Sequence, residues 1–149
     1  MNTVRILFKC NNDTCTTDDG HRSTPLIHAA ANGRVEVVRV LLEGGANVER
    51  VNAYQRTALY IAASHGHLEV CRLLLDWGAK VDPVDWLKET PLHDAVQRGH
   101  LSVAKLLVER GADVRLKNNK GQTASDMARI QGMTVVVNWL ESVSLGKKH

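Results

Sequence analysis

One threonine recurs at an interval of 33 residues through most of the chain, and each copy opens a similar stretch. The copies begin at Thr24, Thr57, Thr90 and Thr123. A fixed period of this length is typical of stacked structural repeats, in which no single unit buries its own apolar face and neighbours supply the burial. The sequence therefore predicts one elongated array rather than a fold around a single centre.

Each copy carries the same signals for the start and the end of helices. The threonine suits a helix N-cap, and Pro25 and Pro91 follow at the first helical position, where no N–H is needed. We expect a first helix of about Pro25–Ala31 in the first copy. A second helix follows, with apolar residues at helical spacing. The glycines expected to end these helices are Gly33, Gly66, Gly99 and Gly132 for the first helix, and Gly45, Gly78 and Gly111 for the second.

Three motifs fill the copies: TPLH-x-A from Thr90, G-H-L-x-V from Gly99 and LL-x-x-GA-x-V from Leu41. Together they resemble the ankyrin repeat over the stretch from Ser23 to the end of the chain. The resemblance implies an all-α solenoid of stacked helix-turn-helix units with β-turn fingers. It also implies a non-enzymatic module that binds other proteins.

The repeat boundaries divide the chain into residues 1–23, 24–56, 57–89, 90–122 and 123–149. The first segment matches the back half of a repeat, and it either caps the array or belongs to a longer one. The next three segments are full ankyrin-like repeats. The last is predicted to be a capping repeat, because Trp139–Ser142 replaces the apolar ending of the other copies and a polar tail follows.

Composition and charge exclude several classes of protein. Apolar residues make up 44% of the chain but only six residues are Phe, Tyr or Trp, so the core is built mainly from Leu, Val and Ala. The net charge of +3 is far from the dense basic stripe of a nucleic-acid-binding domain. No apolar run approaches the ~20 residues of a membrane span. We expect a monomer with no membrane partner, and nucleic acid is a disfavoured partner.

Three cysteines are an odd and sparse set, which indicates reduced thiols and a location inside the cell, in the cytoplasm or the nucleus. Cys71 takes the buried position that Val38 holds in the first copy, so it should be an unreactive small hydrophobe. Cys10 and Cys15 should be more accessible. With His21 nearby, they still match no closed zinc pattern.

The seven histidines are many for this length, yet none forms a metal-binding pair at i, i+4 of a helix. For His67, His93 and His100 the resemblance implies hydrogen bonds to the turns between neighbouring units, whereas His28 is one place out of register. No glycine-rich phosphate loop and no nucleophile with a paired base is present. The chain is therefore predicted to have no catalytic residue, no cofactor, no metal and no small-molecule substrate.

The informative positions are those that vary while the scaffold repeats. In the fold that the chain resembles, the finger tips and one side of each first helix line a concave groove. The side chains there do not pack between repeats. Large aromatics and Arg dominate binding energy at protein interfaces, so Tyr54 and Trp86 at finger tips indicate a binding surface. Trp77 is a further candidate for the same patch. The alternative is that Trp86 folds back onto the array. The predicted partner-binding residues are Tyr54, Arg56, His65, Trp86, Leu87, Glu89, Asp94, Arg98 and Lys120.

The finger turns depart from the ankyrin pattern at one position. Each turn starts with a short polar residue: Asp19, Asn52, Asp85 or Asn118. Where ankyrin turns carry glycine, this chain has Arg22, Gln55 and Lys88, and it keeps only Gly121. A residue other than glycine either adopts a left-handed backbone at some cost or marks a turn of altered type.

Basic residues occur in two rows. Those along the fingers suit a partner in which acidic residues flank an apolar centre. They are Arg22, Arg56, Lys88 and Lys120. The other row is a ladder on the second helices, formed by Arg39, Arg72 and Lys105. Glu36 and Glu69 lie three residues before two of these cations and partly neutralise them, which favours a solvated face.

Three readings of function therefore follow. The first is a protein-protein interaction module that holds a protein or peptide segment in the groove. The second is an architectural spacer, or part of a larger ankyrin-repeat protein whose effector domain lies elsewhere. The third is weak nucleic-acid binding through the basic ladder, which would show a steep dependence on salt.

Overall fold

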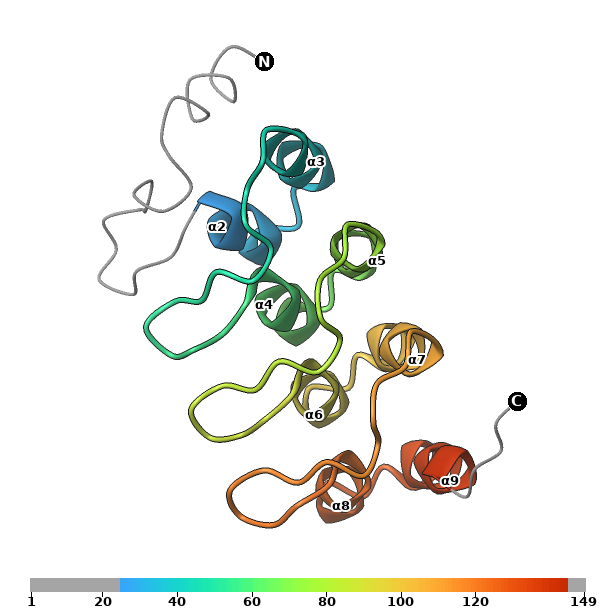
Figure 1. Ribbon diagram of the computed structural model, residues 1–149. Helices are drawn as coiled ribbons and strands as arrows, with labels where there is room; N and C mark the ends of the chain where they lie inside the picture. The colour runs from blue at the N-terminus through green and yellow to red at the C-terminus, as the bar shows by residue number, and fades with distance from the viewer. Residues whose placement is uncertain (1–24, 145–149) are drawn as a thin grey trace.

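The computed structural model describes residues 25–144, and within that range the chain forms eight α-helices and no strand (Figure 1). The all-α solenoid expected from the sequence is confirmed. The helices pair as α2 (Pro25–Ala31) with α3 (Val35–Glu43), α4 (Ala58–His65) with α5 (Leu68–Asp76), α6 (Pro91–Gln97) with α7 (Leu101–Glu109), and α8 (Ala124–Ile130) with α9 (Thr134–Ser144).

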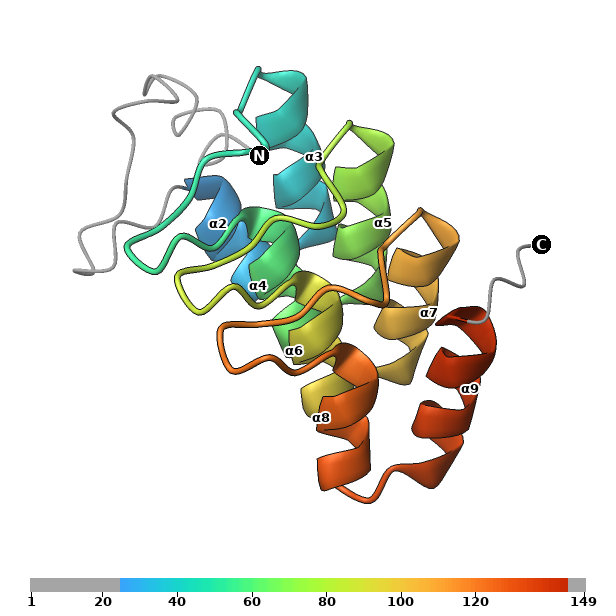
Figure 2. The same cartoon turned by 60° about the horizontal axis from the view of Figure 1, so that its bottom comes forward.

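The helices form two parallel rows. The first helices of the pairs, α2, α4, α6 and α8, lie side by side in one row, and α3, α5, α7 and α9 form the other (Figure 1). Long hairpin loops project from the row of first helices to one side of the array, as Figure 2 shows from a second direction. The predicted half-repeat at residues 1–23 and the polar tail lie outside the described residues.

The helix starts follow the sequence signals. The side chains of Thr57, Thr90 and Thr123 each accept a hydrogen bond from the backbone N–H three residues later, at 3.2, 3.2 and 3.1 Å. Pro25 and Pro91 are the first residues of α2 and α6, as predicted. Thr24, the remaining predicted cap, lies outside the described residues.

Each internal first helix is buried on both sides, because it lies between the first helices of two neighbouring repeats. In α4, for example, Leu59 and Ala62 are fully buried. The second helices bury one apolar stripe, which includes Leu74 and Cys71. Burial raises the pKa of the Cys71 thiol to about 12, so it stays protonated and unreactive at neutral pH. The predicted burial of Cys71 is confirmed, and Cys10 and Cys15 lie outside the described range.

Three histidines join consecutive repeats, as the resemblance implied. The Nε2–H groups of His67 and His100 donate to backbone carbonyl oxygens of the preceding repeat, and that of His93 donates to the last residue of the finger that leads into the next repeat. The acceptors are Ala31 at 3.0 Å, Gln122 at 2.9 Å and Ser64 at 3.1 Å. These histidines therefore have a structural role in the array.

A glycine in the preceding repeat leaves room for the ring of His67 and for the ring of His100. A Cβ atom placed on Gly66, whose φ is 78°, would lie 2.7 Å from the ring of His100. The same short distance separates Gly33 from His67. Glycine is required there both by the left-handed backbone and by the space that the ring occupies.

Candidate interaction surface

The hairpin loops, here called fingers, are built on buried polar residues. The described fingers are the second (residues 52–56), the third (85–89) and the fourth (118–122). In the third, the Oδ1 atom of Asp85 accepts from the backbone N–H groups of Leu87 at 2.9 Å and Glu89 at 3.0 Å. Asn52 and Asn118 make the same pair of bonds in their fingers. Their predicted role in starting the turns is confirmed, while Asp19 lies outside the described residues.

The turns keep their ordinary geometry without glycine. Gln55 and Lys88 adopt left-handed φ angles of 66° and 62°, close to the 77° of Gly121. The alternative of an altered turn type is therefore wrong for these two fingers. Each non-glycine residue costs about 1 kcal/mol in this conformation. Arg22 lies outside the described residues.

Neighbouring fingers are bonded to one another. The backbone N–H of Trp86 donates to the carbonyl oxygen of Tyr54 at 3.4 Å, and that of Asn119 donates to Leu87 at 2.9 Å. These residues, together with Lys120, form a continuous surface that we call the finger row: Tyr54, Trp86, Leu87, Asn119 and Lys120.

The Trp86 ring is exposed but held in place. It packs edge-to-face on the Tyr54 ring, with centroids 5.2 Å apart and an angle of 71° between the planes. Even so, 60% of Trp86 and 41% of Leu87 stay exposed. Trp86 is therefore not buried between repeats, and its fixed ring is open to solvent.

Arg56 is already engaged within the molecule. Its Nε donates to the buried Asp85 carboxylate at 3.1 Å, which ties the second finger to the third. The guanidinium also lies over the rings of Tyr54 and Tyr60, 5.5 and 5.0 Å from their centroids. A buried carboxylate is strongly destabilising without a partner, so Arg56 positions the fingers. The sequence predicted Asp85 only as a turn-starting residue and gave no role to Tyr60, because their contacts with Arg56 are not visible in one repeat.

The predicted acidic residues are also engaged. Asp94 is buried and forms an ion pair with Arg98 at 3.1 Å. The Arg98 side chain is 57% exposed. Glu89 accepts hydrogen bonds from the Tyr60 hydroxyl at 3.5 Å and from Asn118 Nδ2 at 3.3 Å. Burial raises the pKa of Tyr60, which keeps its hydroxyl protonated as a donor. Of the Asp94–Arg98 pair, a partner reaches chiefly the arginine.

A chain with these helix pairs, fingers and junction histidines can be compared with models of known protein families. The family model described as ankyrin repeats (3 copies) matches residues 1–85, and one described as ankyrin repeats (many copies) matches residues 80–128. The chain belongs to the ankyrin-repeat family. Ankyrin repeats are generally non-enzymatic protein-protein interaction modules. The comparison with curated proteins finds no match.

Three further residues named from the sequence, His65, Lys120 and Trp77, make no hydrogen bond or ring contact with the Trp86 ring within the described part of the ankyrin array. His65 is exposed, and its Nδ1–H donates to the Ile61 carbonyl at 2.9 Å while its ring stacks on His67. Lys120 is exposed in the fourth finger. Trp77 is the C-cap residue of α5 and lies outside residues 85–89 of the third finger.

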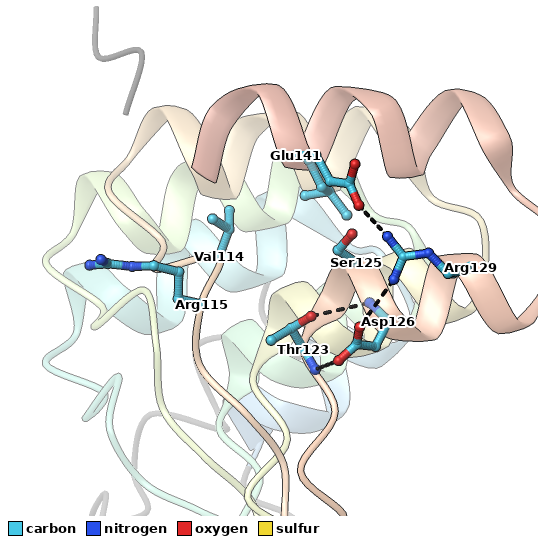
Figure 3. A pocket seen from close by; sticks show the side chains of 8 residues that line it. Val114, Arg115, Thr123, Ser125, Asp126, Arg129 and Glu141 are labelled. Carbon is cyan, nitrogen blue, oxygen red and sulfur yellow. Dashed lines mark hydrogen bonds and ion pairs between the residues drawn. The ribbon is translucent and has the colours of Figure 1, made fainter. Parts of the chain in front are cut away.

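A cavity of about 210 Å³ opens beside α8 in the last repeat (Figure 3). The 33-residue period puts Ser125 where Leu59 and Leu92 fill the core of the internal repeats. The Ser125 hydroxyl is buried and has no hydrogen-bond partner. Arg129 bridges Asp126 and Glu141 at the edge of the cavity. The serine in a leucine position was a signal available from the sequence alone.

The basic ladder on the second helices is solvated and partly neutralised. Arg39 pairs with Glu36 at 3.6 Å, and Arg72 pairs with Glu69 at 3.5 Å. Exposed pairs of this kind contribute little to stability. Within residues 25–144 no cluster of His, Cys, Asp and Glu is arranged to hold a metal ion, and no helix is both long and apolar enough to cross a bilayer.

Proposed function

We propose that this ankyrin-repeat chain binds an extended segment of another protein along the finger row and the adjoining exposed ends of the first helices. The observation that carries the proposal is the Trp86 ring, which is fixed on Tyr54 and yet 60% exposed. Large apolar surface left in water is unfavourable, and covering an aromatic side chain contributes strongly to binding.

The anchors are Tyr54, Trp86, Leu87 and Arg98. Aromatic and arginine side chains are the commonest hot spots of protein interfaces. The two rings already contact each other, so binding orders few side-chain torsions and loses little conformational entropy.

The polar residues around the anchors favour a segment of mixed composition. Arg98 offers an exposed guanidinium beside the buried Asp94, and Glu89 places a second carboxylate next to the fingers. These carboxylates disfavour a uniformly acidic ligand. The segment is therefore expected to carry one or two apolar anchors among polar residues.

The test compares two exposed tryptophans. Proteins retained by the wild-type chain are identified, and their affinity is then measured for Trp86→Ala and for the control Trp77→Ala, whose ring is 46% exposed outside the fingers. Trp86→Ala should weaken binding by more than about 1 kcal/mol, roughly fivefold or more, with an unchanged melting temperature. Trp77→Ala should bind as the wild type does.

Two results would refute the proposal. The first is that both substitutions leave binding unchanged, as expected of an architectural spacer. The second is that affinity falls steeply with salt and does not respond to the loss of the Trp86 ring, as expected of a nucleic-acid-binding chain.

A further inference from the structure

The finger row changes character along the array. One repeat position is occupied by Tyr54, Leu87 and Lys120 in the second, third and fourth fingers. The residue before each finger changes in the same way, from Val51 and Val84, which are 36% and 48% exposed, to an exposed Lys117. The large exposed apolar side chains of the finger row are therefore confined to the second and third fingers, and the fourth finger presents only polar and basic ones.

The lysines are the cations that remain available to a ligand. Among residues 25–144, no ion pair joins Lys88, Lys117 or Lys120 to a carboxylate, whereas Arg56 is held by Asp85. The fourth finger itself contains no acidic residue, since its sequence is Asn-Asn-Lys-Gly-Gln. All three lysines are exposed.

One short segment is long enough to cover both parts. Packed helices lie about 10 Å apart, so the second and fourth fingers are separated by about 20 Å. About six extended residues span that distance. The bonds that join Tyr54 to Trp86 and Leu87 to Asn119 hold the three fingers as one continuous surface.

We propose that the finger row selects a protein segment of divided composition, with apolar side chains on the second and third fingers and Asp or Glu side chains over Lys117 and Lys120. This inference rests on the proposed function and specifies the chemistry of the partner. Complementary charge adds specificity and speeds association, while the apolar half supplies most of the affinity. Over the third finger an acidic residue would meet the carboxylate of Glu89 as well as Lys88, whereas the fourth finger has no carboxylate of its own.

The experiment uses random peptides of about twelve residues displayed on phage, selected against three forms of the full chain. These are the wild type, Lys117→Glu/Lys120→Glu, and the control Lys80→Glu/Lys105→Glu. The selected peptides are then also tested for binding to Trp86→Ala. The control makes the same change of charge at exposed lysines outside the fingers. All of these substitutions are at exposed side chains, and unfolding curves verify that each variant is folded.

The wild type and the control should select peptides with aromatic or aliphatic residues in one half and Asp or Glu in the other. The finger variant should keep the apolar half and select Lys or Arg in place of the acids. One peptide selected on the wild type should bind the finger variant about tenfold more weakly at low salt, and the difference should shrink at high salt.

The selection separates the two proposals. Peptides that depend on Trp86 but show no acidic half, or that bind the finger variant equally well, would overturn this inference and leave the proposed function standing. Selection of no peptide that depends on Trp86 would overturn both. Uniformly acidic peptides that bind Trp86→Ala as well as wild type would also overturn both, and would indicate a simple polyanion site.

Discussion

The third repeat and the last repeat share one backbone plan but differ in what they bury. Both first helices start with a capping box, formed by Thr90 with His93 and by Thr123 with Asp126. Within α6, residues 91–96 are all buried, because α6 contacts both α4 and α8. In α8, the equivalent of Leu92 is Ser125, which lies beside an open cavity.

This difference separates two kinds of information in the sequence. Helix starts depend on hydrogen bonds within about four residues, so they are equally well formed in both repeats. Core packing depends on neighbours on both sides, and in the last repeat polar residues take positions that are apolar elsewhere. Polar substitution of this kind is what the capping repeat predicted from the sequence would require. Substitutions at equivalent positions test the comparison.

The largest effect is expected from giving the third repeat the serine of the last. Leu92→Ser removes a fully buried side chain and leaves a hydroxyl between two neighbouring helices. The free energy of unfolding should fall by about 3–5 kcal/mol, measured by urea denaturation. Ser125→Ala is the control and should change it by less than about 1 kcal/mol. Equal costs at the two sites would show that both repeats are packed alike.

The second test compares how often the two repeats open. Val137 in α9 is the positional equivalent of Cys71 in α5. Two chains are compared, and both carry Cys10→Ser and Cys15→Ser. One keeps Cys71, and the other carries Val137→Cys with Cys71→Ala. A thiol reagent should label the thiol at position 137 about a hundredfold faster than Cys71. End elements open locally more often than central ones. Equal rates would mean that the array opens as one unit, and faster labelling of Cys71 would contradict its burial.

The junctions between repeats give a smaller effect. Gly66→Ala and Gly99→Ala both force a side chain into a left-handed backbone, at about 1 kcal/mol. At Gly66 the new Cβ also meets the ring of His100, whereas the nearest atom to a Cβ on Gly99 is Met133 Cε at 3.9 Å. Gly66→Ala should therefore lower the free energy of unfolding by about 1 kcal/mol more than Gly99→Ala, because the hydrogen bond from His100 to Ser64 is strained as well. Equal melting temperatures for the two variants would refute this.

The smallest effect is expected from filling the cavity of the last repeat. Ser125→Leu restores the side chain of the internal repeats against Val114 and Leu140 and removes an unpartnered hydroxyl. The free energy of unfolding should rise by about 1 kcal/mol, seen as a higher melting temperature. A destabilised variant would show that the cavity walls have closed too far to accept a leucine.

Much of the fold was predictable from the sequence. The 33-residue period, the threonine caps, the positions of Pro25 and Pro91 and the bounds of the first helix all appear as expected. So do the junction histidines and the burial of Cys71. These features depend on short-range hydrogen bonds or on a position that repeats every 33 residues, and both can be recognised in the amino-acid sequence alone.

Only the tertiary structure decided the state of the candidate site. Arg56 looked available to a ligand, yet it is held by Asp85, and Tyr54 lies against Trp86. Each of these contacts joins residues about one repeat apart, so it depends on how neighbouring fingers stack and not on local sequence. The sequence by itself determined which residues reach the fingers. Stacking determined which of them remain exposed, because the buried Asp85 carboxylate and the Tyr54 ring each take a partner from the adjacent repeat.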